Sequence, residues 1–580
     1  MQRDGTIAYS IVTNRLGNPT FERRLRVCCR REPPLTPSIA RKPVHAHTFM
    51  MQTLNYLAGL LAMQDRRRGG RLSAVEEPQE RVVGDAVAWC VAHGASYAAP
   101  VAAGEAPSLS FTHAPFALFP FPFPRSEYER LVAMQPAFNR LVERVARDAA
   151  WLEATLEQTA ASDAFTRRLL ELRRSQTSAQ TASLGLLRSD YMIDAGPGSG
   201  DAPFENGKAL QVELNTIASS FGCLSTVLSS LHAYVAAKYA GGVDDAWLPL
   251  PKNGATAGLA RGIAAAHAEY ERQYPPAAGA PPRRVAVVVQ PGERNQMDQR
   301  MLEHELWDAH GVAMERVTLL EALKDGVADA SGALTFRGGA WELSVAYFRA
   351  GYSPDEYLGD GEWAARALLE NSRAIKCPTA AYQLAGCKKV QQALAAPGEL
   401  EKFLPAAEAA ELRTVFAGLY DLDVAEDAGA VEAVVAEALA HPDKYVLKPQ
   451  REGGGNNLYG AELKDALETL SPADRAAFIL MDRINPPQRR ATLVRDGAPI
   501  EGDCVCELGV YGTILARPAD GGGAPVELHN EVVGHLLRQK LLGVDEGGVA
   551  AGFAVLSSPA LVGKPSAMGP DVAKLLGSRA

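Results

Sequence analysis

Residues Lys448-Pro-Gln-Arg-Glu-Gly-Gly-Gly-Asn-Asn-Leu-Tyr-Gly460 follow the strand-like run Lys444-Tyr-Val-Leu447 and are the most informative stretch of the chain. Three consecutive glycines allow the backbone to turn several N–H groups into one concavity, the arrangement that cradles phosphate oxygens. Lys448 precedes this glycine loop, and Glu452 lies at its edge. A lysine and a carboxylate beside such a loop favour an anion that carries a divalent cation. The stretch therefore predicts a site for Mg-ATP.

Two commoner nucleotide-binding loops do not fit this stretch. The P-loop, G-x-x-x-x-G-K-[ST], places its lysine after the glycines, and the G-x-G-x-x-G loop spaces its glycines differently. A flexible surface loop is the alternative interpretation. That interpretation suits Gly521-Gly-Gly523, which lies between two short apolar runs and predicts a hairpin tip. Charged and amide residues crowd around the glycines of 448–460, which favours a ligand site there.

Composition excludes several classes of partner. The chain has 580 residues, enough for two or three domains, with 47% apolar and 22% charged residues, as in ordinary globular proteins. A formal charge of −9 gives no broad attraction to nucleic acid or anionic membrane, and the best apolar run, Tyr56 to Met63, is too short to span a bilayer.

Eight scattered cysteines indicate a reducing compartment. Cys28-Cys29 and Cys504-x-Cys506 lack zinc-site spacing and are interpreted as structural thiols.

The first 78 residues differ from the rest of the chain. They are rich in arginine, poor in acidic residues and without sustained periodicity. An organelle transit peptide has this composition. The segment is also low in serine, and Met50, Met51 and Met63 are alternative starts, so an unstructured or misassigned leader is equally consistent. We expect a cytoplasmic protein, or a plastid or mitochondrial one if the leader is a transit peptide.

The remaining chain alternates helix-like and strand-like patterns and predicts an α/β (α+β) fold. Aromatic and proline residues alternate over 111–124, which indicates an extended segment packed on the core. A strand over 284–290, a loop, a helix through Leu302 and Trp307 and a strand ending at Tyr347-Phe348 indicate an open α/β subdomain. Three further helices are expected, at 138–152, at 363–375 and at 425–440. The expected division is 1–78, 79–282, 283–388, 389–560 and a tail at 561–580.

Polar residues in strands and loops provide candidate ligands outside the glycine loop. The strand Gln211-Val-Glu-Leu-Asn215 puts Glu213 and Asn215 on one face, where a carboxylate and an amide oxygen suit a hard cation if Glu452 approaches. A solvated strand face is the alternative. Arginines suited to bidentate capture of a carboxylate occur in Arg188-Ser-Asp-Tyr191, Glu293-Arg-Asn295 and Arg349-Ala-Gly-Tyr352, and surface ion pairs are the alternative for each. Arg538-Gln-Lys540 precedes a second small-residue loop, Gly547-Gly-Val-Ala-Ala-Gly552.

Taken together, these segments resemble eukaryotic-type glutathione synthetases, which are ATP-grasp ligases, from about Gln79 to Pro559. The motifs that carry the resemblance are residues 211–222, 347–352, 376–378, 383–392, 448–460, 478–484, 506–509 and 534–538. The resemblance implies an ATP-grasp fold with an inserted open α/β substrate-binding subdomain and flanking helices. It also implies a homodimer.

The resemblance implies a role for each matching residue. The implied magnesium ligands are Glu213, Asn215 and Glu452, and the implied catalytic residues are Arg188, Lys448 and Arg538. The implied ATP contacts are Glu213, Lys388, Lys448, Pro449, Gln450, Arg451, Glu452, Gly453, Gly454, Gly455, Asn456, Asn457, Tyr459, Met481, Asp482, Arg483, Ile484, Glu507, Lys540 and Glu546. The implied substrate contacts are Arg188, Ile217, Ala218, Ser219, Ser220, Glu293, Arg294, Asn295, Gln299, Arg349, Ala350, Gly351, Tyr352, Arg538, Val549 and Ala550.

Two features depart from the family pattern. Glu546 occupies a position where the family usually has aspartate, which puts the last ATP contact in doubt. The stretch Ala195 to Gly207 is longer than expected and is interpreted as a surface excursion.

The implied reaction is ATP-dependent ligation of γ-glutamylcysteine with glycine through an acyl phosphate. Related enzymes that use β-alanine carry a bulkier Leu-Pro pair where this chain has Ala550-Ala551, and this difference favours glycine as the acceptor. A synthetase that uses β-alanine or another amino acid is the first alternative. A non-catalytic ATP-binding regulatory relative is the second alternative. The chain keeps every metal-ligand position and also Lys388 and Lys448, which the resemblance implies to be the phosphate-binding lysines, and this disfavours that alternative.

Overall fold

The computed structural model describes residues 12–13, 19–20, 79–99, 108–178, 180–197, 207–239, 250–451, 455–519, 521, 523–545, 547–549 and 552–563. The chain divides into two compact units, Met1–Arg66 and Arg67–Ala580. In the first unit, β1 (Val12–Thr13) pairs antiparallel with β2 (Pro19–Thr20). All other described elements belong to the second unit.

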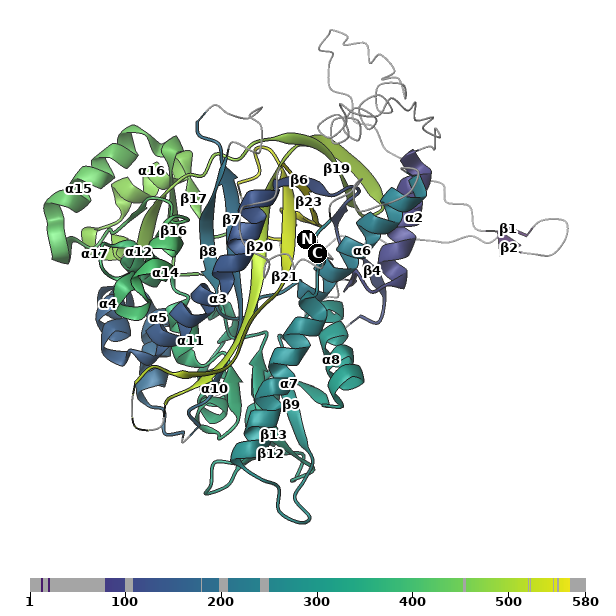
Figure 1. The fold of residues 1–580 in the computed structure, drawn as a ribbon, viewed down its shortest axis with the longest axis vertical. Coiled ribbons are helices and arrows are strands. Elements are labelled where there is room, and N and C mark those ends of the chain that lie inside the picture. Colours follow the sequence, from purple (N-terminus) through teal and green to yellow (C-terminus); the bar gives the residue numbers. More distant parts are fainter. Residues whose placement is uncertain are drawn as a thin grey trace, which may run out of the picture. The chain divides into compact units, whose positions relative to one another are not determined.

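A thirteen-stranded sheet organises the second unit (Figure 1). Its main path runs through β10 (Met314–Val317), β9 (Arg283–Val288), β13 (Trp341–Phe348), β14 (Ile375–Cys377), β7 (Ser183–Asp194), β20 (Ala498–Arg517), β19 (Arg489–Arg495), β5 (Phe116–Ala117), β22 (Val555–Ser557) and β21 (Val526–Leu541). Off this path, β8 (Lys208–Asn215) pairs with β7, and β11 (Val327–Ala328) pairs with β12 (Leu334–Phe336), which pairs with β13. The strands from β10 to β7 are parallel, whereas β7, β8, β20 and β21 pair antiparallel.

A separate four-stranded antiparallel sheet carries the lysine that precedes the glycine loop. Its order is β15 (Leu419–Tyr420), β18 (Phe478–Asp482), β16 (Tyr445–Pro449) and β17 (Leu458–Tyr459). The helices α15 (Val424–Ala440) and α16 (Gly460–Thr469) share an apolar core with this sheet. Two short pairs complete the strands, β3 (Ser96–Ala98) with β4 (Phe111–His113), and β6 (Phe121–Pro124) with β23 (Pro559–Val562).

Helices cover both faces of the large sheet, because side chains along its strands alternate between apolar cores on its two faces. In β20, Val510 and Ile514 belong to one core, whereas Tyr511 and Leu515 belong to the other. The helices that contribute to the first core are α3 (Arg125–Arg147), α4 (Ala149–Ser162), α5 (Ala164–Arg174), α11 (Ala380–Ala385), α12 (Lys388–Ala395), α13 (Leu400–Phe403) and α14 (Ala406–Arg413). The second core takes residues from α2 (Gln79–Ala92), α6 (Gly222–Tyr239), α7 (Ala255–Gln273) and α8 (Gln296–His310). The remaining helices are α9 (Leu319–Asp325), α10 (Asp360–Asn371), α17 (Pro472–Arg475) and the 3₁₀ turns η2 (Pro354–Glu356) and η3 (Pro442–Lys444).

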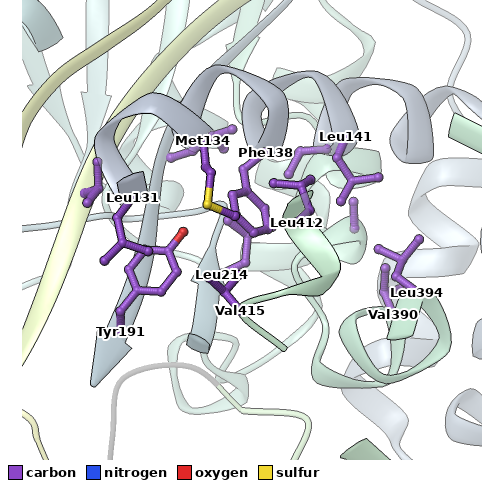
Figure 2. Packing of buried hydrophobic residues seen from close by; sticks show 14 of the residues in the cluster. Leu131, Met134, Phe138, Leu141, Tyr191, Leu214, Val390, Leu394, Leu412 and Val415 are labelled. Atoms are coloured by element: carbon purple, nitrogen blue, oxygen red, sulfur yellow. The ribbon is translucent and has the colours of Figure 1, made fainter. Parts of the chain in front are cut away.

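The first core lies beneath the strands that carry the predicted metal ligands. Figure 2 shows Met134 and Phe138 of α3 packed beside Leu214, the residue between Glu213 and Asn215 in β8. Leu214 therefore points into the core. The alternation of the strand turns the two polar neighbours to the opposite face, as the sequence predicts.

The architecture confirms the predicted α/β class. The helix at 296–310, the strands β9 and β13, the helix α15 and the hairpin between β20 and β21 are confirmed. The buried strands β5 and β6 confirm the extended segment within 111–124. No described helix is long and apolar enough to cross a membrane.

Three element boundaries differ from the prediction. The helix expected at 138–152 is interrupted at Asp148, whose side chain accepts from the Trp151 N–H at 3.0 Å and begins α4. The helix expected to reach Ile375 ends at Asn371, because Ile375–Cys377 forms β14 before Pro378. Lys448 and Pro449 belong to strand β16 rather than to the loop that follows it.

Candidate active site

Two cavities meet between the small sheet and the antiparallel part of the large one. The first, of about 370 Å³, is lined by Val446 and Lys448 of β16, by 481–486 around the end of β18 and by 540–545 after β21. The second, of about 240 Å³, is lined by strands β7, β8 and β21 and by the loops that follow β8, β9 and β13. Residues that line both cavities include Val212, Lys448, Tyr459 and Lys540, so the two spaces adjoin at Lys448.

The first cavity is lined by residues to which the family resemblance assigns a role in ATP binding. Met481, Asp482, Arg483 and Ile484 all line it, as the resemblance implies. Lys448 is buried, and its Nζ donates to the Val212 carbonyl of β8 at 2.9 Å. This bond holds the ammonium group where the two cavities join.

The start of the glycine loop is anchored to the N-terminus of α12. Lys388 Nζ donates to the Arg451 carbonyl at 2.5 Å, and the Lys389 N–H donates to Gln450 Oε1 at 3.1 Å. Arg451 in turn forms an ion pair with Asp163 at 2.7 Å. These contacts place two buried lysines, Lys388 and Lys448, close to the carboxylate of Glu213.

Cations surround Glu213. Its Oε2 lies 3.7 Å from Lys388 Nζ. Burial opposes the charge of Glu213, but Lys388, Lys448, Arg538 and Arg188 hold the pKa of this carboxyl well below its ordinary value. Glu213 therefore remains an anion at neutral pH, as a ligand for a divalent cation must.

The chemistry of Glu213 and Asn215 fits a divalent metal ion. Asn215 Nδ2 lies 3.4 Å from Glu213 Oε1, so the two side chains are adjacent. The same Nδ2 donates to Asp190 Oδ2 at 3.0 Å, and no hydrogen bond from a described residue occupies Oδ1 of Asn215. A carboxylate and a free amide oxygen are ligands that Mg²⁺ prefers. No group of three or more His, Cys, Asp or Glu residues within the described part of the chain could hold a metal ion, and the expected third ligand, Glu452, lies outside that part.

Two arginines in the second cavity are held by the protein's own carboxylates. Arg188 binds Asp190 through Nε at 2.7 Å and Nη2 at 2.8 Å, and its Nη1 donates to the Ser220 carbonyl at 3.2 Å. Arg538 binds Asp190 at 3.0 Å and also forms an ion pair with Glu507. Burial raises the pKa of Glu507, and Arg538 opposes that shift. Surface ion pairs, the alternative interpretation for Arg188, are excluded, because both members of its pair are buried.

The loop after β8 has a strained backbone at the cavity wall. Ala218 and Phe221 have φ angles of 50° and 74°, a conformation that residues with side chains seldom adopt. Asp298 of α8 holds the loop in place by accepting from the N–H groups of Phe221 at 2.9 Å and Cys223 at 3.0 Å. The Tyr511 hydroxyl donates to the Ser220 carbonyl at 2.5 Å. Strain of this kind persists only where surrounding contacts enforce it, and it is common at ligand sites.

Asp298 also binds Arg349, a third arginine that lines the second cavity. Arg349 Nη1 lies 3.0 Å from Asp298 Oδ2, and both side chains are buried. Thus one carboxylate connects the loop at 217–221 with the segment at 349–352. The turn of that segment is held by Glu356, whose Oε2 accepts from the N–H groups of Gly351 at 3.1 Å and Tyr352 at 2.8 Å.

The segment after β21 contacts the small sheet. Asp545 Oδ1 forms an ion pair with Arg483 Nη2 at 2.7 Å, and its carbonyl accepts from the Tyr459 hydroxyl at 3.4 Å. Lys540 Nζ also donates to the Asp545 carbonyl. Val549, farther along, is buried and lines the second cavity.

Most of the described site residues named from the sequence gather around the two cavities. Those that line neither cavity are Lys388, Pro449, Gln450, Arg451, Gly455, Asn456, Ser219, Arg294, Gln299, Ala350 and Gly351. Glu452, Gly453, Gly454, Glu546 and Ala550 lie outside the described residues. Sequence reasoning missed Asp190, Asp298, Tyr511 and Asp545 as contributors to the site.

The chain matches a known protein family over most of its length. A model of the family described as "Eukaryotic glutathione synthase, ATP binding domain" matches residues 76–561. The chain belongs to the eukaryotic glutathione synthase family. It is 39% identical over 492 residues to "Glutathione synthetase, chloroplastic" of Solanum lycopersicum, which covers 83% of this chain and 84% of that protein. It is 41% identical over 460 residues to "Glutathione synthetase" of Homo sapiens, covering 77% of this chain and 90% of that protein.

A solved structure confirms the fold. A glutathione synthetase-like effector from Globodera pallida superposes with a TM-score of 0.63 at 22% identity, over 84% of this chain and 98% of the effector. At that identity the likeness shows the fold alone. The family membership rests on the sequence comparisons.

Proposed function

We propose that this chain is a glutathione synthetase, an ATP-dependent ligase that joins γ-glutamylcysteine to glycine and releases ADP and phosphate. The observation that carries the proposal is the junction of the two cavities at Lys448. A nucleotide in the first cavity and a peptide in the second would bring a phosphate and a carboxylate together there. Family membership supports the same reaction.

The first proposed step forms an acyl phosphate. The cysteinyl carboxylate of γ-glutamylcysteine attacks the γ-phosphorus of ATP, and the bond from that phosphorus to the ADP oxygen breaks. Negative charge builds up on the phosphoryl oxygens, which cations and N–H groups stabilise. Lys448 and Lys388 are placed to supply that charge, because both are buried beside Glu213.

The second proposed step forms the peptide bond. The amine of glycine attacks the acyl carbon, loses its proton, and inorganic phosphate leaves with the bonding electrons. Arg538 lines the second cavity near the buried Val549 and is proposed to bind the incoming glycine. Arg188, Ser220 and Arg349 line the same cavity and are proposed to hold γ-glutamylcysteine.

Glu213, Asn215 and Glu452 are proposed to hold Mg²⁺. The ion, when bound, would neutralise charge on the phosphates of ATP. The role of Asn215 in this set is to present Oδ1, since its Nδ2 is committed to Asp190.

Phosphate release measured with an acceptor panel tests the proposal. We expect release from Mg-ATP only when γ-glutamylcysteine and an amino acid are both present, with glycine ahead of β-alanine, serine and D-alanine. One methylene of difference is worth only about 1–3 kcal/mol, so β-alanine should react more slowly rather than not at all. Faster turnover with β-alanine or D-alanine would assign a different ligase. ATP binding without any release would indicate a non-catalytic relative.

Compartment and assembly are further parts of the proposal. The tomato and Arabidopsis thaliana relatives are called chloroplastic, and the arginine-rich leader of this chain supports a plastid location if it acts as a transit peptide. A fluorescent protein fused after residue 78 distinguishes that location from the cytoplasm. We also propose a homodimer, which light scattering of the purified chain tests.

A further inference from the structure

Asp190 of β7 is a buried carboxylate on which three site residues converge. Its side chain is 1% exposed. Four donor atoms reach it, Arg188 Nε at 2.7 Å, Arg188 Nη2 at 2.8 Å, Asn215 Nδ2 at 3.0 Å and Arg538 Nη2 at 3.0 Å. These donors come from three strands, β7, β8 and β21.

The sheet register leaves room for this convergence. Asp190 pairs with Glu213 in β8 and with Gly509 in β20. A Cβ atom at position 509 would lie 2.6 Å from Asp190 Oδ1 and 2.7 Å from Arg188 Cδ. The absence of a side chain at this point of β20 therefore leaves the space that the Asp190 carboxylate and the Arg188 side chain occupy.

The chemistry of the three donors requires a carboxylate at this position. An ionised carboxylate offers only acceptors, on two oxygens, and can take all four bonds. An amide at 190 would replace one oxygen by a donor, which would face an N–H of Arg188, Asn215 or Arg538. A neutral group at 190 would also remove a negative charge that the guanidinium groups of Arg188 and Arg538 share.

We propose that Asp190 is a positioning residue that sets the geometry of the metal ligand Asn215 and of two cavity arginines, Arg188 and Arg538, at once. By accepting from Asn215 Nδ2, it fixes the rotation of that amide and turns Oδ1, the atom suited to Mg²⁺, away from itself. By binding two nitrogens of Arg188 and one of Arg538, it orients two of the guanidinium groups that line the second cavity. The inference rests on the proposed function for the identity of the ligands.

Asp190→Asn tests the inference, with Glu370→Gln as the matched control. Glu370 is also fully buried and paired with an arginine, Arg366 at 3.0 Å, but it lines neither cavity. We expect Asp190→Asn to weaken Mn²⁺ binding, measured by EPR with a non-hydrolysable ATP analogue present, by about 10- to 100-fold. The KM values for γ-glutamylcysteine and for glycine should rise together. Glu370→Gln should lower thermal stability but leave Mn²⁺ affinity and both KM values within about twofold of the parent.

Asp190→Glu keeps the charge and moves it by one methylene, so it separates position from charge. We expect this variant, too, to bind Mn²⁺ more weakly and to show both raised KM values. The inference is overturned if Asp190→Asn or Asp190→Glu folds and keeps the Mn²⁺ affinity and both KM values of the parent. If the parent chain makes no glutathione, the proposed function fails, whereas the Mn²⁺ titration still tests Asp190.

Discussion

Gly509 is the residue on which the Arg188–Asp190 pair depends most directly. A Cβ atom there would overlap both members of the pair, and neither can move, because both are buried and bound to other groups. We expect Gly509→Ala to lower the free energy of unfolding by about 1–3 kcal/mol, as overpacking does. We also expect it to reduce kcat/KM strongly, because Arg188 must shift.

The same substitution at Gly84 is the control. Gly84 is exposed in the middle of α2, and a Cβ atom there would meet nothing within 4 Å. Alanine at this position should stabilise the protein by about 0.5–1 kcal/mol, because glycine is a poor helix former. Thermal unfolding and phosphate release measure both variants. Equal effects of the two substitutions would mean that Gly509 has no special role.

The residues proposed to contact ligands were easier to predict than the residues that hold them in place. Arg188 and Arg349 were named from their motifs, but their partners Asp190 and Asp298 were not. For Asp190 a signal was present, because residues i and i+2 of a strand share a face. For Asp298 there was none, since it lies on α8 and binds the start of α6, 75 residues earlier. Contacts over such distances in sequence leave no periodic pattern.

At the scale of elements, the segment after β21 and the small sheet form one wall of the first cavity. The Arg483–Asp545 ion pair at 2.7 Å joins them, and the Arg483 guanidinium lies 5.5 Å from the centre of the Tyr459 ring. Both members of the ion pair are partly exposed, so the pair is worth at most about 1 kcal/mol and is screened by salt. We expect Arg483→Ala to raise the KM for ATP by about two- to fivefold at low salt.

Arg490→Ala is the control for this prediction. Arg490 forms a comparable ion pair with Glu501 at 3.1 Å on neighbouring strands, but neither residue lines a cavity. Its loss should leave the KM for ATP unchanged. Steady-state kinetics at about 0.05 and 0.5 M salt should show that the parent and Arg483→Ala converge at high salt. A difference that persists at high salt would show that Arg483 acts by contact with the nucleotide and not by holding Asp545.

The elements themselves were predictable where periodicity is local. The strand, loop and helix order from residue 283 onward followed from the apolar runs, and the structure confirms it. The sequence did not indicate that β14 pairs with β7 and so joins these strands to the antiparallel part of the sheet. Strand partners are set by contacts between distant segments, and a three-residue strand such as β14 is too short to show a period. The domain boundaries at 282 and 388 stay a prediction.

At the scale of the whole molecule, two buried histidines connect elements that are far apart in sequence. His232 of α6 bonds the Ser558 hydroxyl and the Ala117 carbonyl, and His535 of β21 lies 3.0 Å from the Tyr128 hydroxyl of α3. Burial lowers the pKa of His232 to about 4, although the bond to Ala117 opposes this shift, and burial lowers the pKa of His535 to about 3. Both imidazoles are therefore neutral in the folded protein at neutral pH.

These two pKa values predict loss of stability in mild acid. The unfolded chain binds protons at the ordinary histidine pKa of 6.5, whereas the folded chain does not until about pH 4 or 3. The stabilisation that comes from keeping these histidines neutral is thus complete above pH 6.5. It is lost as the pH falls toward the pKa values of the histidines in the folded protein. Each histidine should lower the free energy of unfolding by about 2 kcal/mol between pH 7 and pH 5. Urea unfolding at both pH values measures this difference in the free energy of unfolding. The difference should shrink in His232→Gln. It should persist in the control His304→Gln, because His304 is exposed on α8. An equal pH dependence in all three proteins would contradict the prediction, because it would place the proton uptake on other groups.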